Sequence, residues 1–97
     1  MRPHMIRSFK DKKTEAVFNG ESPRGFPSNL VKVARRKLAM VNAVRELEDL
    51  KSPPANKLHR LTGDRAGQRA IWVNIQFRVC FVWHDGDAYD VEVTDYH

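Results

Sequence analysis

The pair Pro53-Pro54 divides the sequence into two parts with different hydrophobic periods. Proline lacks a backbone N–H and disfavours helical backbone in the residue before it, so no helix continues through this pair. Before the pair, apolar residues recur at helical spacing over residues 30–41, and after it they alternate at every second position over residues 77–83. A run of helices followed by a run of strands predicts an α+β fold, with helices packed on an antiparallel sheet.

The first part predicts an extended segment and then helices. Residues 5–9 are expected to be extended, and Asp11 is placed to cap a brief helix that ends at Asn19-Gly20. A second helix is predicted through residues 30–41, and Asn42 is expected to restart a third that lasts to Leu50. The last two would form an αα-hairpin.

The second part predicts a β-meander from residues 57–61, 68–73, 77–84 and 88 onward. The expected fold has two or three helices on this sheet, in a β-α-α-β-β-β order. The apolar alternations of residues 77–83 and 89–93 must share one face, which places Arg78 on the other face, opposite Glu92 or Thr94. This register brings the last three residues to the same end of the sheet as Arg78.

Positive charge is confined to the first four fifths of the chain. All 17 Lys and Arg residues lie at or before Arg78, where seven acids leave a net charge of +10, and residues 79–97 hold five acids without Lys or Arg. A basic body predicts a polyanionic partner such as nucleic acid, because neutralised phosphates release counterions. The alternative is a soluble basic domain in which Lys32, Arg35 and Arg36 form a solvated helix face.

The sequence also indicates the cellular compartment. Cys80 is the only cysteine, so no disulfide can form within the chain. Because no apolar run has the length of a signal peptide or a membrane span, we expect a cytoplasmic protein that does not bind membranes. Residues 1–4 precede a second methionine and are interpreted as an upstream start or an expression remnant, which leaves residues 5–97 as one domain.

The residue types suit metal-free RNA cleavage, in which the ribose 2′-OH attacks the adjacent phosphate. The four histidines lack zinc-site spacing and no Gly-rich phosphate loop is present, so neither a metal nor another cofactor is expected. An imidazole has a reference pKa of about 6.5 and can transfer protons, whereas a guanidinium stays charged and can stabilise a phosphorane. Candidates for this chemistry are His59, Arg78, Asp95, Tyr96 and His97.

Three of these candidates also have a purely structural interpretation. His59 would be a half-exposed strand residue, Arg78 one half of a cross-strand ion pair, and His97 a functionless chain end. Trp72 and Trp83 are interpreted as core or interface anchors in preference to base-stacking platforms.

Taken together, these residues resemble the HigB branch of the RelE-like bacterial toxins, also described as plasmid-maintenance killer proteins. The resemblance covers residues 5–97, and the order and spacing of its motifs make it specific. These motifs are Met5-Ile6-Arg7-Ser8-Phe9, Leu47-Glu48-Asp49-Leu50 with Pro53-Pro54, Lys57-Leu58-His59, Gly63-Asp64-Arg65-Ala66-Gly67, Phe77-Arg78-Val79-Cys80-Phe81 and Asp95-Tyr96-His97.

The resemblance implies a microbial-ribonuclease-like fold and a ribosome-dependent mRNA endonuclease that cuts A-site codons, inhibits translation and arrests growth. It also implies a helix-turn-helix antitoxin, HigA-like, that neutralises the toxin; the pair would repress its own operon, and operator DNA would be bound only through that complex. Lys57 and Arg65 are implied phosphate contacts. The implied active-site residues are His59, Arg78, Asp95, Tyr96 and His97.

Two positions depart from some members of this family, which carry lysine where Thr62 stands and arginine where Asn74 stands. Fewer cations near the cut imply slower cleavage, not its absence.

Two other functions are compatible with the sequence. One is a non-catalytic module that docks on nucleic acid or the ribosome through its cations, namely Lys32, Arg35, Arg36, Lys57 and Arg65. The other is a protein-binding module whose basic surface receives an acidic antitoxin.

Overall fold

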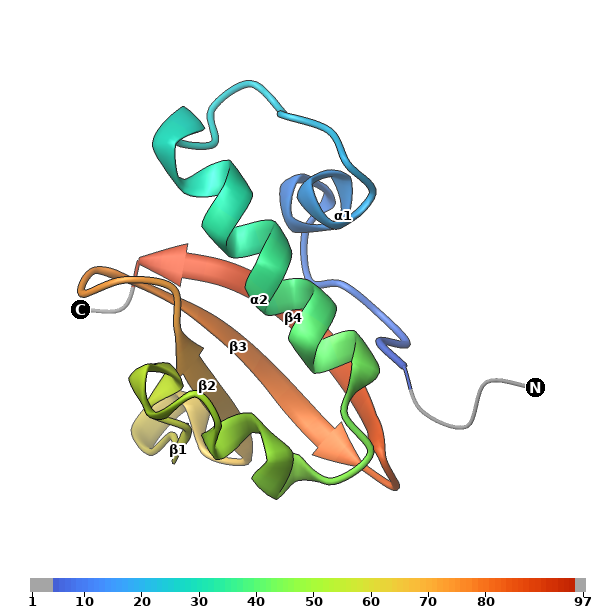
Figure 1. The fold of residues 1–97 in the computed structure, drawn as a ribbon. Helices are drawn as coiled ribbons and strands as arrows, with labels where there is room; N and C mark the ends of the chain where they lie inside the picture. The colour runs from blue at the N-terminus through green and yellow to red at the C-terminus, as the bar shows by residue number, and fades with distance from the viewer. Residues whose placement is uncertain (1–4, 96–97) are drawn as a thin grey trace.

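The computed structural model of this protein describes residues 5–95, which form two layers (Figure 1). An antiparallel sheet of four strands lies under the two α-helices, and its strands are neighbours in the order in which they occur in the chain. The helices are α1 (Lys12–Phe18) and α2 (Val31–Ala43), and the strands are β1 (His59–Arg60), β2 (Gln68–Trp72), β3 (Phe77–His84) and β4 (Asp87–Asp95). Four 3-10 turns join them: η1 (Ser28–Leu30), η2 (Leu47–Lys51), η3 (Pro54–Asn56) and η4 (Gly63–Arg65). The predicted α+β class is confirmed.

Helix α1 begins and ends where the sequence predicts. The Asp11 carboxylate caps it by accepting a hydrogen bond from the Thr14 backbone N–H at 2.7 Å, and Gly20 follows it with a positive φ of 96°. The Thr14 hydroxyl donates to Asp11 and accepts from the Val93 backbone N–H at 3.0 Å. The cap of α1 therefore also fixes the helix to strand β4.

Helix α2 covers the sheet with the predicted apolar face. Its buried residues include Val31, Ala34, Leu38 and Val41. They form one core with buried side chains of the sheet, namely Ile71, Val73, Val79, Phe81, Ala88 and Val91.

The predicted third helix and its αα-hairpin are wrong. Helix α2 ends at Ala43, and Val44 is already extended, with φ −73° and ψ 146°. The chain then forms the short turn η2, which is closed by a reciprocal capping box between Glu46 and Asp49. Leu50 is fully buried, so a 3-10 turn is sufficient to bury the leucine that the helix was expected to bury.

A buried polar contact holds this non-helical segment against α2. The Lys37 ammonium donates to the side-chain oxygen of Asn56, whose amide donates to the Leu50 carbonyl at 3.1 Å and to the Ser52 carbonyl at 3.4 Å. Burial, and secondarily the nearby charge of Arg36, lowers the pKa of Lys37. The amide of Asn56 thus gives hydrogen-bond partners to the buried Lys37 ammonium and Leu50 carbonyl.

The β3–β4 hairpin contains a bulge that sets which residues face the helices. Asp85 and Gly86 form its tight turn with φ values of 50° and 83°, so His84 pairs with Asp87. The register shifts by one residue between Cys80 and Val82, close to Asp90 with its φ of 53°. Val79 pairs with Val93 and both face the core, as the alternation predicts. The prediction is wrong for Tyr89, because the bulge pairs Tyr89 with Val82 and gives the core position to Ala88.

The N-terminal segment is extended but is not a continuous strand. Ile6 and Phe9 form isolated parallel bridges with Ala88 and Val91 of β4. Between these bridges, the Asp90 backbone N–H donates to the Ser8 hydroxyl at 2.8 Å. The first described residues therefore hold the bulged part of β4.

Within residues 5–95, no helix has the length and apolar character needed to cross a membrane.

We predict that Asn56→Ala lowers the free energy of unfolding by about 2–4 kcal/mol, because it removes the partner of the buried Lys37 ammonium and of two carbonyls. Urea unfolding measures this change. Asn29→Ala, at an exposed position, is the matched control and should change stability by less than about 0.5 kcal/mol. Equal stability of the two variants would contradict the anchoring role of Asn56.

Candidate active site

The face of the sheet opposite α2 carries two of the polar candidates, Arg78 and His59. Val79 and Phe81 of β3 pack under the helices, so strand alternation directs Arg78 and Cys80 to the other face. Arg78 pairs with Thr94 on β4, one of its two predicted partners, and with Trp72 on β2. We call this side of the sheet the open face.

Arg78 is held firmly at the end of the open face. It is only 8% exposed, and its Nη1 donates to the carbonyls of Asn74, Ile75 and Phe77 at 2.8, 3.1 and 3.3 Å. The Asn74 side chain in turn accepts from the backbone N–H groups of Gln76 and Phe77, which closes the β2–β3 turn. Asn74 thus stabilises the turn whose carbonyls bind Arg78. A cationic side chain at this position could not accept the two backbone hydrogen bonds that the asparagine accepts.

Trp72 contacts two cations. The Arg78 guanidinium carbon lies 4.0 Å from the indole centroid, and the Lys57 ammonium lies 5.0 Å from it. Trp72 is partly buried but is not part of either buried apolar cluster of residues 5–95. Trp83, by contrast, packs against the core with its ring 6.3 Å from that of Phe81, as predicted for an anchor.

His59 lies on the same face, on the edge strand β1. It pairs with Ala70, which pairs with Cys80 of β3, so the register places His59 one row from Trp72 and Arg78. Its Nδ1 is 2.8 Å from the Lys57 carbonyl oxygen, a contact that fixes the ring orientation.

Asp95 reaches the same end of the sheet from β4. Asp95 pairs with Phe77, so strand alternation places it on the helix-covered face. It directly follows Thr94, which pairs with Arg78. Its carboxylate accepts a hydrogen bond from Gln76 Nε2 at 2.8 Å. Tyr96 and His97, the other two predicted members of this group, lie outside the described residues.

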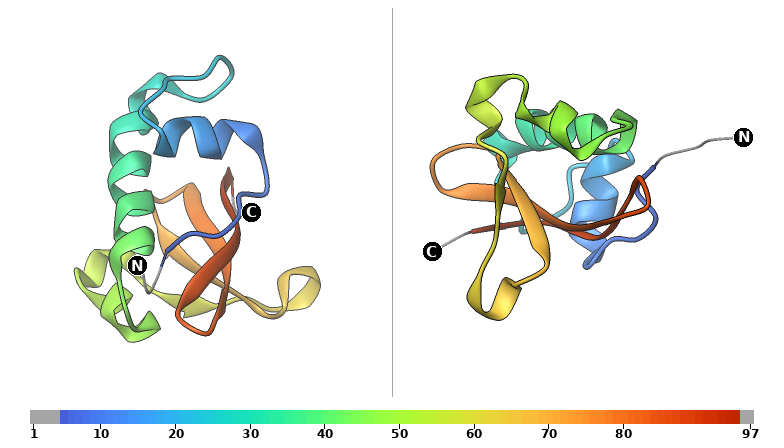
Figure 2. Two further views of the ribbon diagram at one scale, coloured as in Figure 1. Left: turned by 90° about the vertical axis from the view of Figure 1, so that its right-hand side faces the viewer. Right: turned by 90° about the horizontal axis from the view of Figure 1, so that it is seen from below.

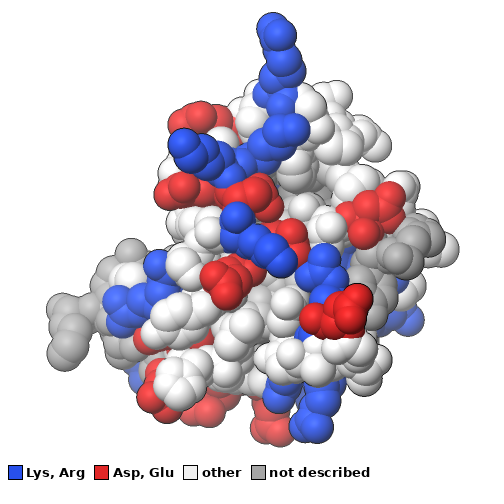
Figure 3. Space-filling model, turned by 180° about the vertical axis from the view of Figure 1, so that it is seen from behind, with Lys and Arg blue, Asp and Glu red and all other residues white. Residues whose placement is uncertain are grey.

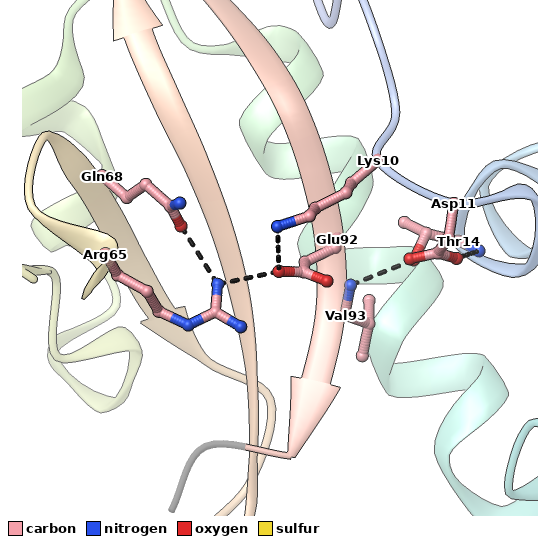
Figure 4. A network of polar contacts seen from close by, with 7 residues as sticks. All are labelled: Lys10, Asp11, Thr14, Arg65, Gln68, Glu92 and Val93. Atoms are coloured by element: carbon pink, nitrogen blue, oxygen red, sulfur yellow. Dashed lines mark hydrogen bonds and ion pairs between the residues drawn. The ribbon is translucent and has the colours of Figure 1, made fainter.

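Arg65, a predicted phosphate contact, takes part in an ion-pair network on the open face (Figure 4). Its Nη1 is 2.8 Å from Glu92 Oε1 and 3.2 Å from Gln68 Oε1, and the Lys10 ammonium is 3.8 Å from the same oxygen of Glu92. Glu92 is the least exposed charged group of the three. Because Arg65 belongs to η4 and Glu92 to β4, their ion pair holds η4 against β4.

The predicted binding cations do not share one surface. The loop around η4, with Arg65, projects on the opposite side of the sheet from α2 (Figure 2). Lys32 and Arg36 are exposed on α2, whereas Arg35 donates to the carbonyls of Val17 and Glu21, both at 2.9 Å. On the side away from α2, Lys and Arg are interspersed with Asp and Glu (Figure 3). This face is therefore mixed in charge and is not a continuous basic patch.

The remaining candidate groups have a limited chemical repertoire. Burial raises the pKa of the Cys80 thiol to about 11, although the nearby charge of Arg65 opposes the shift. Such a thiol is a poor nucleophile at neutral pH. Within residues 5–95, no three His, Cys, Asp or Glu side chains gather as they would around a metal ion.

Sequence reasoning missed Trp72 and Gln76 as neighbours of the site. A signal for Trp72 was present, because a turn at residues 74–76 pairs position 72 with position 78. The hydrogen bond from Gln76 to Asp95 depends on the direction of one side chain in a turn, which no sequence period specifies.

Comparison with known proteins gives a consistent result. Residues 7–97 match the family model for the RelE-like toxin of the type II toxin-antitoxin system HigB. The chain is 34% identical to Endoribonuclease HigB of Proteus vulgaris over 93 residues, covering 96% of this chain and all of that protein. It is 36% identical to Toxin HigB-1 of Vibrio cholerae over 85 residues, covering 87% of this chain and 90% of that protein.

A similar fold occurs in the YoeB-YefM complex from Staphylococcus aureus. A chain of that complex superposes with a TM-score of 0.53 at 12% identity, covering 95% of this chain and 97% of that one. At this identity, the similarity concerns the fold alone.

We predict that Cys80 resists alkylation by iodoacetamide at pH 8 in the folded protein and reacts rapidly in urea, because its pKa of about 11 leaves almost no thiolate. The pKa of Cys80 in the folded protein lies above the ordinary value of 9.0. The contribution of the neutral thiol to the free energy of unfolding is therefore present below pH 9 and is lost as the pH rises through about 11. Mass spectrometry of the alkylated protein measures the reaction. Rapid labelling of the folded protein at pH 8 would contradict this prediction.

Proposed function

We propose the following activity for this chain, which belongs to the HigB-like family of RelE-like toxins in type II toxin-antitoxin systems. The protein is an endoribonuclease that cuts mRNA codons in the ribosomal A site and thereby inhibits translation. A helix-turn-helix antitoxin neutralises it, and the two together repress their operon. The toxin family and the name of the Proteus vulgaris relative support the nuclease activity.

The observation that carries the proposal is the geometry of Arg78. Its guanidinium is mostly buried and is oriented by three carbonyls and an indole, so it needs little rearrangement when charge develops beside it. In RNA cleavage by the 2′-OH, charge develops on the non-bridging phosphate oxygens. A preorganised cation stabilises that transition state better than a mobile one.

Proton transfer would come from the imidazoles of the proposed site. His59 has its Nδ1 at the Lys57 carbonyl, which leaves Nε2 as the ring nitrogen that can accept or donate a proton toward the substrate. We assign His97 the complementary role of general acid, which returns a proton to the departing 5′ oxygen. Tyr96 would donate a hydrogen bond or stack on a base, and Asp95 would orient the neighbouring groups.

A surface of mixed charge is compatible with an mRNA substrate that the ribosome holds in place. Because Arg65 and Arg35 have protein partners, free RNA would gain less from this surface than the net charge suggests. On the ribosome the mRNA is already positioned, and orientation alone can be worth roughly 7–11 kcal/mol. A small set of catalytic side chains is then sufficient.

We predict that Arg78→Ala and His97→Ala each lower mRNA cleavage on translating ribosomes by at least about 100-fold, because each removes a group that acts in the transition state. Primer extension on the mRNA measures the cut. Arg45→Ala, which changes an exposed arginine before η2, is the control and should cleave normally.

The folded state of every variant is checked by circular dichroism, because Arg78 is mostly buried. Normal cleavage by both the Arg78 and the His97 variants would exclude the proposed site and favour a non-catalytic binding module. Equal cleavage of the same mRNA with and without ribosomes would contradict ribosome dependence.

A further inference from the structure

We propose that Trp72 is a positioning residue that holds Lys57 and Arg78 toward the phosphate backbone of the RNA. This inference rests on the proposed function and extends it to a residue that has no ionisable group. The indole itself takes no part in bond breaking, and it acts through the two cations it contacts.

The position of Trp72 is costly unless the ring has a local role. It lies on the open face, opposite Arg78 and outside the core. An indole there gives up the larger apolar burial that it would obtain under α2. In exchange its π-face attracts cations, an interaction that strengthens as water is excluded. The burial of Arg78 supplies that exclusion.

Both cations are oriented by more than the ring. The Nη1 atom of Arg78 is fixed by the three carbonyls near the β2–β3 turn, and the guanidinium carbon lies 4.0 Å from the indole centroid. Lys57 occupies the left-handed backbone region with φ 49° and ψ 48°, which is uncommon for a residue with a side chain. This turn leads into β1, and the Lys57 ammonium lies over Trp72.

The arrangement places two like charges around one ring. The Arg78 guanidinium carbon and the Lys57 ammonium lie 4.0 and 5.0 Å from the same indole centroid, so an anion that approaches both is attracted by two positive charges. A phosphodiester is the anion that the proposed substrate supplies, and Arg and Lys are both suited to bind it. Trp72 would therefore prepare the site before the RNA arrives.

The test compares Trp72→Leu, which removes the aromatic face, with Trp72→Phe, which keeps one. Trp83→Leu is the matched control, because Trp83 packs against the core beside Phe81. Single-turnover cleavage is measured at saturating translating ribosomes, and the Nε–Hε resonance of Arg78 is followed by NMR. Thermal unfolding gives the stability of each variant.

We expect Trp72→Leu to lower the cleavage rate constant about 10-fold, with Trp72→Phe within about 3-fold of the unmodified protein. The Arg78 resonance should lose its ring-current shift in the leucine variant and keep part of it in the phenylalanine variant. Trp83→Leu should keep both the rate and the resonance, even where it lowers thermal stability.

Two outcomes overturn the inference in different ways. If Trp72→Leu cleaves as fast as the unmodified protein, the positioning role is wrong and the proposed nuclease function stands. If the unmodified protein does not cleave mRNA on ribosomes, the proposed function is wrong, and so is the assignment of RNA phosphate to the two cations, whatever the NMR result.

Discussion

Residues 78–81 of strand β3 are buried, and the strand pairs with a neighbour along each edge. The packing around them depends on that burial. Helix α2 covers Val79 and Phe81 on one face. On the other face, Leu61 and Ala70 cover Cys80. A charge in such a strand is stable only when it is paired or solvated. Arg78 meets this condition through three backbone carbonyls and the indole of Trp72. The contacts that stabilise the buried charge therefore also fix the orientation of its side chain.

The sequence predicted those features that depend on local period or on a single capping residue. Alternation in residues 77–83 and 89–93 determined which side of β3 packs under the helices and correctly gave Thr94 as a possible partner of Arg78. Asp11 and Gly20 correctly marked the limits of α1. These features were accessible because each is decided within a few residues or by one hairpin.

The features that sequence reasoning missed depend on contacts between distant segments. The spacing of Leu47 and Leu50 fits one turn of either an α-helix or a 3-10 helix, and the outcome is tied to Asn56, which joins this segment to Lys37. Helical position alone marked Arg35 as a surface cation, yet it binds carbonyls at and beyond the end of α1. Arg65 became part of an ion-pair network only through its approach to Glu92, 27 residues later in the sequence.

The contact between the bulge of β4 and the N-terminal segment has a consequence for the order of events during synthesis. Ser8 leaves the ribosome early, but its hydroxyl and carbonyl are bonded to Asp90 and Val91, which are translated more than 80 residues later. Folding that begins at the N-terminus can therefore build α1 and α2 but not the register of β4 beside Arg78. The end of the sheet proposed to cut RNA would be completed only after β4 has been synthesised.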